Sequence, residues 1–485
     1  MEKKGILKHF ATIGIGTILN MAFGFLATIL ITRMVSPGYY GELSIFKMYG
    51  SLAGSILLLG LDQALVRFYY NSDAREYKST LLRFCVRWSL IVTAIIACIV
   101  IVIASTGVAD TGYSPVYWIA LAIYTAGIIY SRFSTTVLRL EYKTKEYSWC
   151  NVSQQIVYIV LAIVLLKIYD SNEAAILIVA TILGQYSVAF FSRIAGKLYW
   201  VRSKCDLTTH SVTKRELVQY AWPFIITTSV ATLFQSIDKI SLNYFCDYNE
   251  VGVYSSALVL MNVFAILQST FNTLWTPLSV EHYSKAPKDH AFYKKAQEII
   301  TVLMFAFGLT VILCKDVFAI ILGRDYREAA YLIPFLAFHP IMYTISEVTV
   351  GGLVFKKKSK IQVIVSVVPC VVNFIGNTIL VPLYGGRGAA ISTGASYILF
   401  FAMRTILSNK YYYIDYSIKR FSFLTVLSVL YATYATFHAA NIMLFCFYVF
   451  VVIVMLVLYK NTVREMVNYG ISFVKKRGRW GGLRE

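Results

Sequence analysis

Residues 89–106 read SLIVTAIIACIVIVIAST and contain no charged side chain. Counted from residue 84, the apolar segment is long enough to cross about 30 Å of hydrocarbon, which takes about 20 residues. Backbone N–H and C=O groups in lipid must be satisfied within their own segment, so a span of this kind is helical. This stretch therefore predicts a membrane-spanning helix.

Similar segments recur along the whole chain. Of the 485 residues, 58% are hydrophobic and 14% are charged, and the mean hydropathy is +0.64. A soluble domain is roughly a quarter charged, so this class is excluded. The net charge of +20 would suit a nucleic-acid-binding protein, but such a protein would not carry so much apolar sequence. We predict an all-α polytopic membrane protein with about fourteen spans, near residues 10–32, 43–66, 84–106, 115–138, 150–168, 173–199, 217–245, 251–279, 297–322, 329–353, 361–382, 388–408, 420–438 and 440–460.

The distribution of positive charge predicts the topology. Cytoplasmic loops are enriched in Lys and Arg, and an even number of spans places both termini on one side. With both termini in the cytoplasm, nearly all of the 45 Lys and Arg residues lie in cytoplasmic loops or at inner helix ends. The exceptions are Arg33, Lys47, Lys167, Lys239, Lys315, Arg324, Arg327 and Arg387.

The sequence also resembles itself at an offset of about 211–215 residues. A repeat of six helices, an even number, gives two copies of the same orientation, related by an axis along the membrane normal. Transporters commonly place the substrate between such halves. We therefore predict a 6+6+2 arrangement: an N-lobe at 1–205, a C-lobe at 206–416, and two further helices with a basic tail at 417–485. The matches are SPGYYG (36–41) with DYNEVG (247–252), YKTK (142–145) with FKKK (355–358), and YDSNEAA (169–175) with YGGRGAA (384–390).

Several short motifs resemble the polysaccharide transporter (Wzx-type) family of the multidrug/oligosaccharidyl-lipid/polysaccharide flippase superfamily. They are VSPGYYG (35–41), GLDQALVRFY (60–69), IDK (237–239) followed by GVY (252–254), and PLYGGRGAA (382–390). The resemblance implies two six-helix lobes around a central cavity in the bacterial inner membrane. It also implies flipping of undecaprenyl-diphosphate-linked oligosaccharides for surface polysaccharide assembly, with a polymerase and glycosyltransferases as partners.

Positive side chains within the spans are candidate ligands for an anionic lipid diphosphate. Arg binds phosphate oxygens in pairs and Lys acts as a point charge. We predict Arg33, Arg67, Arg132 and Lys239 as substrate-binding residues. The alternative is that Arg33 and Arg67 extend to the membrane interface, or that Asp62 with Arg67, or Asp238 with Lys239, forms a structural ion pair.

Three acidic residues are candidates for proton or sodium coupling: Asp62, Asp238 and Glu347. Ionisable groups within spans are costly and often functional. The alternative is that each belongs to a satisfied ion pair. We expect no catalytic residue, metal site or cofactor, and no nucleic-acid partner.

Three other functions compete with an oligosaccharide flippase. A lipid II (peptidoglycan precursor) flippase is the nearest alternative, because its substrate is also a lipid diphosphate. A multidrug exporter of the same fold would favour an anionic cavity, which the intramembrane cations oppose. A membrane polymerase or ligase typically has a long outer loop, whereas the outer loops predicted here are short.

Overall fold

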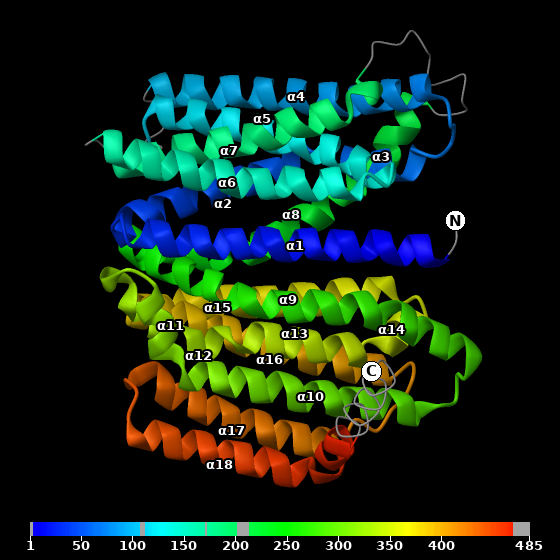
Figure 1. Cartoon of the computed structure of the whole chain (residues 1–485), viewed down its shortest axis with the longest axis vertical. Coiled ribbons are helices and arrows are strands. Elements are labelled where there is room, and N and C mark those ends of the chain that lie inside the picture. The colour runs from blue at the N-terminus through cyan, green and yellow to red at the C-terminus, as the bar shows by residue number, and fades with distance from the viewer. Residues whose placement is uncertain (1–2, 107–111, 170–171, 201–212, 469–485) are drawn as a thin grey trace, which may run out of the picture. The chain divides into compact units, whose positions relative to one another are not determined.

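The computed structural model describes residues 3–106, 112–169, 172–200 and 213–468, and every regular element in these ranges is a helix (Figure 1). Within these ranges, eight helices are long and apolar enough to cross a membrane, and the count rises to as many as twelve spans when each of four bent pairs counts as one. The fold class is therefore confirmed. The count of fourteen and the 6+6+2 arrangement stay predictions.

Two compact units divide the chain, residues 1–255 and 256–485. The first contains α1 (Lys3–Thr32), α2 (Pro37–Leu57), α3 (Leu61–Phe68), α4 (Arg75–Thr106), α5 (Pro115–Leu140), α6 (Thr144–Ile168), α7 (Glu173–Ala195), η1 (Lys197–Tyr199), α8 (Lys214–Phe245) and the first turns of α9 (Tyr248–Lys285). The second contains the rest of α9 and α10 (His290–Leu313), α11 (Lys315–Ile321), η3 (Arg324–Tyr331), α12 (Ile333–Leu336), α13 (Phe338–Thr349), α14 (Gly351–Phe355), α15 (Ser359–Tyr384), α16 (Gly386–Asn409), α17 (Ile418–Phe437) and α18 (Ile442–Leu458).

The first unit extends past the predicted lobe boundary because α8 packs against α2 and α3. A division by packing does not test a division by repeat, so the three predicted domains stay predictions. Residues 205 and 206 at that boundary, residues 170–171 of the third sequence match, and the tail 469–485 lie outside the described residues.

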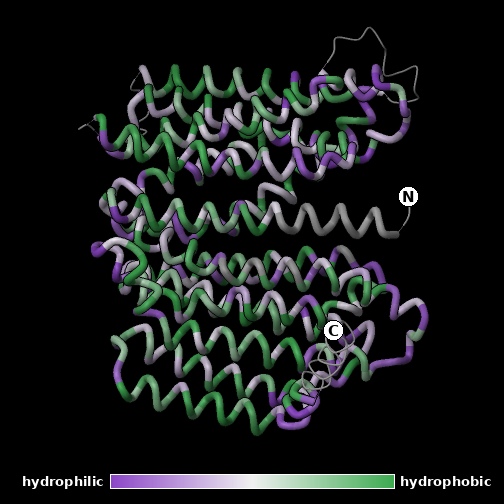
Figure 2. Tube along the Cα trace, viewed as in Figure 1, coloured by the Kyte–Doolittle hydropathy of each residue, from purple (hydrophilic) through white to green (hydrophobic). Residues whose placement is uncertain are grey.

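Hydropathy follows the helices along their length. Figure 2 shows hydrophobic residues along the helix bodies, with hydrophilic residues gathered towards many helix ends and connections. Several ends are capped by side chains that satisfy the free N–H groups of the first turn. Ser114 accepts from the backbone of Tyr117 at the start of α5, and Thr213 and Glu216 form a reciprocal capping box at the start of α8.

The internal repeat is visible in local geometry. After α5, Tyr142 has a positive φ and the N–H of Lys143 donates to the carbonyl of Leu138 over 2.9 Å. After α14, Lys357 has a positive φ and the next N–H donates to the carbonyl of Leu353 over 2.8 Å. Both turns are helix ends of the Schellman type, and their offset is 215. The structural match therefore pairs Tyr142 with Lys357, two residues beyond the pairing suggested by sequence.

Helix packing repeats in part as well. In the first unit α4 packs on α5, α5 on α7 and α6 on α7. In the second unit the same relations join α10 with α13, α13 with α16 and α15 with α16. These pairings support the predicted repeat.

A sharp bend separates α2 from α3. The two helices meet at 52°, where Leu59 and Gly60 both have positive φ. A Cβ at Gly60 would lie 2.1 Å from the carbonyl oxygen of Ala221 in α8. Glycine is needed there for its backbone conformation and for the close approach of α8. The bend places α3, and with it Asp62, against α8.

Candidate functional site

The two copies of the first repeated motif meet in the structure. A Cβ at Gly41 in α2 would lie 1.8 Å from the carbonyl oxygen of Tyr248, and a Cβ at Gly252 in α9 would lie 2.0 Å from that of Pro37. Gly41 matches Gly252 and Pro37 matches Tyr248 at the offset of 211. Each copy thus contacts the other through the same positions, as in a two-fold interface. We call this contact the glycine crossing.

A polar link lies one turn beyond the glycine crossing. The hydroxyl oxygens of Ser44 and Ser255 are 2.7 Å apart, and these residues also match at the offset of 211. Both are buried. The ammonium of Lys239 in α8 donates to the Ser44 hydroxyl over 2.8 Å. Lys239, predicted from sequence as a substrate ligand, is therefore joined to the meeting point of the two motifs.

A second lysine lies beside the first. Lys47 is one helical turn after Ser44 in α2, and its ammonium is 4.4 Å from the ring centre of buried Tyr158. Ser44, the acceptor of the Lys239 ammonium, stands three residues before it, so both lysines lie near the same turn of α2. Within the described residues, neither ammonium belongs to an ion pair within 4.0 Å. We call Lys47 and Lys239 the lysine pair.

Asp238 precedes Lys239 and is buried. The phenol of Tyr254 in α9 donates to its carboxylate over 2.6 Å. A carboxylate fixed by a fully buried phenol has a defined orientation. Asp238 therefore adds a negative charge beside the lysine pair.

The short α3 helix carries two predicted site residues, Asp62 and Arg67, and only Asp62 is in an ion pair within 4.0 Å among the described residues. Asp62 is buried, and the guanidinium of Arg132 in α5 lies 3.4 Å from its carboxylate. The amide of Gln63 also donates to Asp62 over 2.9 Å. Arg67 is exposed, with its guanidinium 5.8 Å from the ring centre of Phe68. Asp62 therefore forms an ion pair, but with Arg132 and not with Arg67, the partner that the sequence suggested.

Arg33 lies in the turn after α1 and is exposed. The first unit therefore does not gather the four predicted cations at one place. Lys239 is grouped with Lys47, Arg132 is paired with an acid, and Arg33 and Arg67 are on the surface. Sequence reasoning overlooked Lys47 as a ligand, although it stands in an otherwise apolar span three residues after Ser44.

Glu347, the third predicted acid, lies in the second unit and is paired. The guanidinium of Arg404 in α16 donates to its carboxylate over 2.8 Å and to the Ser346 hydroxyl over 2.8 Å. Both charged side chains are 15% exposed. The indole of Trp275 donates to the Glu347 carbonyl over 3.2 Å, beside a small cavity of about 40 Å³. Arg404 had been assigned to an inner helix end, so its role in this pair was not foreseen.

A further ion pair joins the first turn of α4 to the end of α5. Glu141 accepts from the ammonium of Lys78 over 2.9 Å and from the phenol of Tyr69 over 2.7 Å. Burial raises the pKa of the Glu141 carboxyl, but hydrogen bonds from Tyr69, Lys78 and Tyr199 and the positive charge of Lys78 together lower it more, so the pKa lies below its ordinary value. We call Glu141, Lys78 and Tyr69 the Glu141 clamp.

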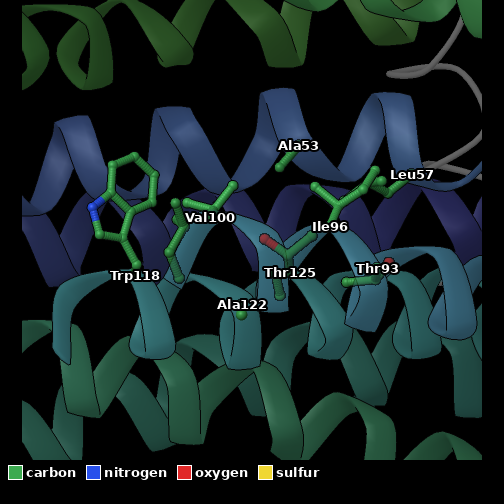
Figure 3. A pocket seen from close by; sticks show the side chains of 10 residues that line it. Ala53, Leu57, Thr93, Ile96, Val100, Trp118, Ala122 and Thr125 are labelled. Carbon is green, nitrogen blue, oxygen red and sulfur yellow. The ribbon is translucent and has the colours of Figure 1, made fainter. Parts of the chain in front are cut away.

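An apolar cavity of about 110 Å³ lies apart from these polar groups (Figure 3). Figure 3 shows side chains from α2, α4 and α5 lining it, with the hydroxyl of Thr125 among them. Its lining residues are Ala53, Leu57, Thr93, Ile96, Ala97, Val100, Trp118, Leu121, Ala122 and Thr125. Across the described part of the chain, no three His, Cys, Asp or Glu side chains are grouped as metal ligands would be.

The family model for a polysaccharide biosynthesis protein matches residues 30–331, which is more than half of the chain. The chain belongs to this family. It is 20% identical over 396 residues to the uncharacterized membrane protein MJ1068 of Methanocaldococcus jannaschii, covering 77% of each chain. It is 22% identical over 301 residues to Agl15 of Haloferax volcanii, a probable low-salt glycan biosynthesis flippase, covering 60% of this chain and 59% of that protein.

Solved structures share its fold. The inward closed conformation of the lipid II flippase MurJ has a TM-score of 0.68 at 14% identity, covering 94% of this chain and 99% of that one. An inward-facing multidrug resistance MATE family transporter of the MOP superfamily has a TM-score of 0.57 at 17% identity, covering 81% and 94%. The chain is thus a multi-pass membrane protein with the fold of this superfamily, and the family predicted from its motifs is confirmed. Apart from MJ1068, the proteins named here are described as flippases or transporters.

Proposed function

We propose that this protein flips an undecaprenyl-diphosphate-linked oligosaccharide across the bacterial inner membrane, with both termini in the cytoplasm. Family membership and the flippases among the relatives support the reaction class. The lysine pair carries the proposal for the substrate. Two ammonium groups inside membrane helices are costly unless anions offset their charge. Asp238 supplies one negative charge beside them, and a diphosphate, a dense anion, would supply more.

Each predicted ligand then has a distinct role. Lys47 and Lys239 bind the diphosphate, with Tyr158 holding the first and Ser44 the second. Arg33 and Arg67, which are exposed, attract the head group to the protein surface. The exposed side of the Arg132 guanidinium also attracts the head group, while the other side pairs with Asp62.

Reconstituted vesicles test this proposal. The measurement is the rate at which a lipid-linked oligosaccharide in one leaflet becomes accessible to a glycosidase added on the other side. A charge-assisted hydrogen bond contributes about 1.5–3 kcal/mol, so Lys47→Gln with Lys239→Gln should slow flipping at least tenfold. Lys285→Gln, at an exposed site in a surface ion pair, is the matched control. A double variant that is folded and flips within twofold of the wild-type rate would refute the assignment.

Lipid II is the second candidate substrate, because MurJ shares the fold and the substrate carries the same diphosphate. The two are distinguished by offering both lipids to the same vesicles. Organic cations are a poorer fit, because the lysine pair repels them. A polysaccharide polymerase and glycosyltransferases are the proposed protein partners, and membrane lipids surround the spans.

Ion coupling is proposed for the acids that the sequence singled out. Asp238 is the strongest candidate because its carboxylate, which accepts from Tyr254, belongs to the residue next to Lys239. The test is flipping with and without a proton or sodium gradient. Equal rates in all conditions would remove the coupling from the proposal.

A further inference from the structure

Three side chains from three helices form a continuous polar chain at the glycine crossing. Lys239 in α8 donates to Ser44 in α2 over 2.8 Å, and the Ser44 oxygen is 2.7 Å from that of Ser255 in α9. The two serines are buried. Lys239, which we propose binds the diphosphate, is therefore one hydrogen bond away from the contact between the two copies of the motif.

The chemistry of the three groups gives this chain a direction. An ammonium has donors and no acceptor, so the Ser44 oxygen accepts from Lys239. Either hydroxyl could donate in the Ser44–Ser255 contact, and the cation on Ser44 favours Ser44 as the donor. A hydroxyl that accepts from a cation becomes a better donor, because hydrogen bonds in a series polarise one another. The Ser44–Ser255 bond is strongest while Lys239 donates to Ser44.

The glycines of the crossing pack against backbone. The close contacts of Gly41 and Gly252 are with carbonyl groups of the opposite segment, and van der Waals contacts of this kind are individually weak. The serine contact adds a hydrogen bond between α2 and α9. Its loss would weaken the contact between the two segments.

We propose that an anionic head group bound at Lys239 loosens the glycine crossing by drawing the ammonium away from Ser44. This inference rests on the proposed function, because it takes the diphosphate as the ligand of Lys239. Without an anion, the acceptor at Ser44 holds the Lys239 ammonium, and the crossing is closed. With a diphosphate present, the Ser44–Ser255 bond weakens and α2 separates from the start of α9.

The contrary view is that the crossing is a fixed pivot. A pivot would stay closed whatever occupies the lysine pair. The two views therefore differ in one measurable quantity, the opening of the crossing in response to an anion.

A cysteine pair reports that opening and leaves the polar chain intact. A Cβ at Gly38 would lie 3.1 Å from the side chain of Asn249, so Gly38→Cys with Asn249→Cys places two thiols across the crossing. The full-length protein, with its eight native cysteines replaced, is held in lipid nanodiscs. The rate of disulfide formation is measured with and without inorganic pyrophosphate. Loss of one hydrogen bond of ordinary strength should make disulfide formation about fivefold slower with pyrophosphate than without it.

Two variants connect the response to the chain. Ser255→Ala should slow cross-linking without pyrophosphate and remove the response to it, and Lys239→Gln should also remove the response. Lys285→Gln, at the exposed control site, should keep it. A response that persists in Lys239→Gln overturns the proposal.

Calorimetry on the same samples distinguishes the two levels of failure. Pyrophosphate that binds without changing the cross-linking rate overturns the loosening and leaves the diphosphate site standing. Pyrophosphate that does not bind the wild-type protein overturns the diphosphate site, and this inference with it. Hydrogen exchange of residues 36–44 in the unsubstituted protein checks the cysteine result. Faster exchange with pyrophosphate is expected, and unchanged exchange counts against the proposal.

Discussion

The Glu141 clamp allows a prediction with a worked magnitude. The Lys78 and Glu141 side chains are 11% and 20% exposed and their charged atoms are 2.9 Å apart. Exposed ion pairs contribute about 0.2–1 kcal/mol, and removing one partner of a buried pair costs about 3–5 kcal/mol. The clamp lies between these limits. Glu141→Gln, which keeps an acceptor for Tyr69 but loses the charge, should lower the free energy of unfolding by about 2 kcal/mol.

A double-mutant cycle isolates the pairwise contribution. Lys78→Met, Glu141→Gln and the double variant are unfolded by titration with a denaturing detergent. The expected coupling is about 1–2 kcal/mol. The matched control is the pair Lys285 and Glu281, 73% and 62% exposed, where the expected coupling is about 0.3–0.5 kcal/mol. A clamp coupling no larger than the control value would refute the reasoning.

The pH dependence of stability gives a second test of the prediction for Glu141→Gln. The folded pKa of Glu141 is lowered, so its contribution to stability is present above the pKa of the unfolded chain. It is lost as the pH falls through the folded pKa. The difference in stability between wild type and Glu141→Gln should therefore shrink in acid. A difference that grows as the pH falls would contradict the assignment.

Three further predictions concern packing and charge. Gly41→Ala should prevent stable folding because its Cβ would meet a carbonyl oxygen at 1.8 Å, whereas Gly24→Ala, with its nearest neighbour at 3.8 Å, should fold; thermal stability of the purified proteins measures both. Ala122→Leu places its added carbons in the apolar cavity of about 110 Å³, so its melting temperature should stay within a few degrees of wild type, and a large fall would mean that the cavity is not free. Glu347→Gln leaves Arg404 without a carboxylate, and should destabilise the protein by about 1–3 kcal/mol in detergent unfolding; restored stability in the double variant with Arg404→Met would support the pair.

The helical membrane fold could be predicted from sequence because hydrocarbon imposes the same demand on every span. The repeat could be predicted because glycine at 41 and at 252 serves one contact, which keeps the same residue at both positions. The turn at Tyr142 was paired two residues from its true match, since backbone conformation at a helix end leaves little trace in a run of lysines.

The partners of the charged residues could not be predicted. Glu141 meets Lys78 from 63 positions away, and Glu347 meets Arg404 from 57. Such contacts depend on which helices are neighbours and on how each helix is rotated about its axis. A hydropathy pattern predicts neither of these. Lys47 was overlooked because its significance comes from Lys239, which a different helix brings beside it.

The glycine crossing bears on how a chain of this kind could arise. Each half of the contact is made by the same short motif, so neither half needs a feature that the other lacks. Two identical chains of half the length could make the same contact with one another, as a symmetric dimer. Joining them end to end would preserve it, and afterwards neither glycine could change without damage to the opposite copy.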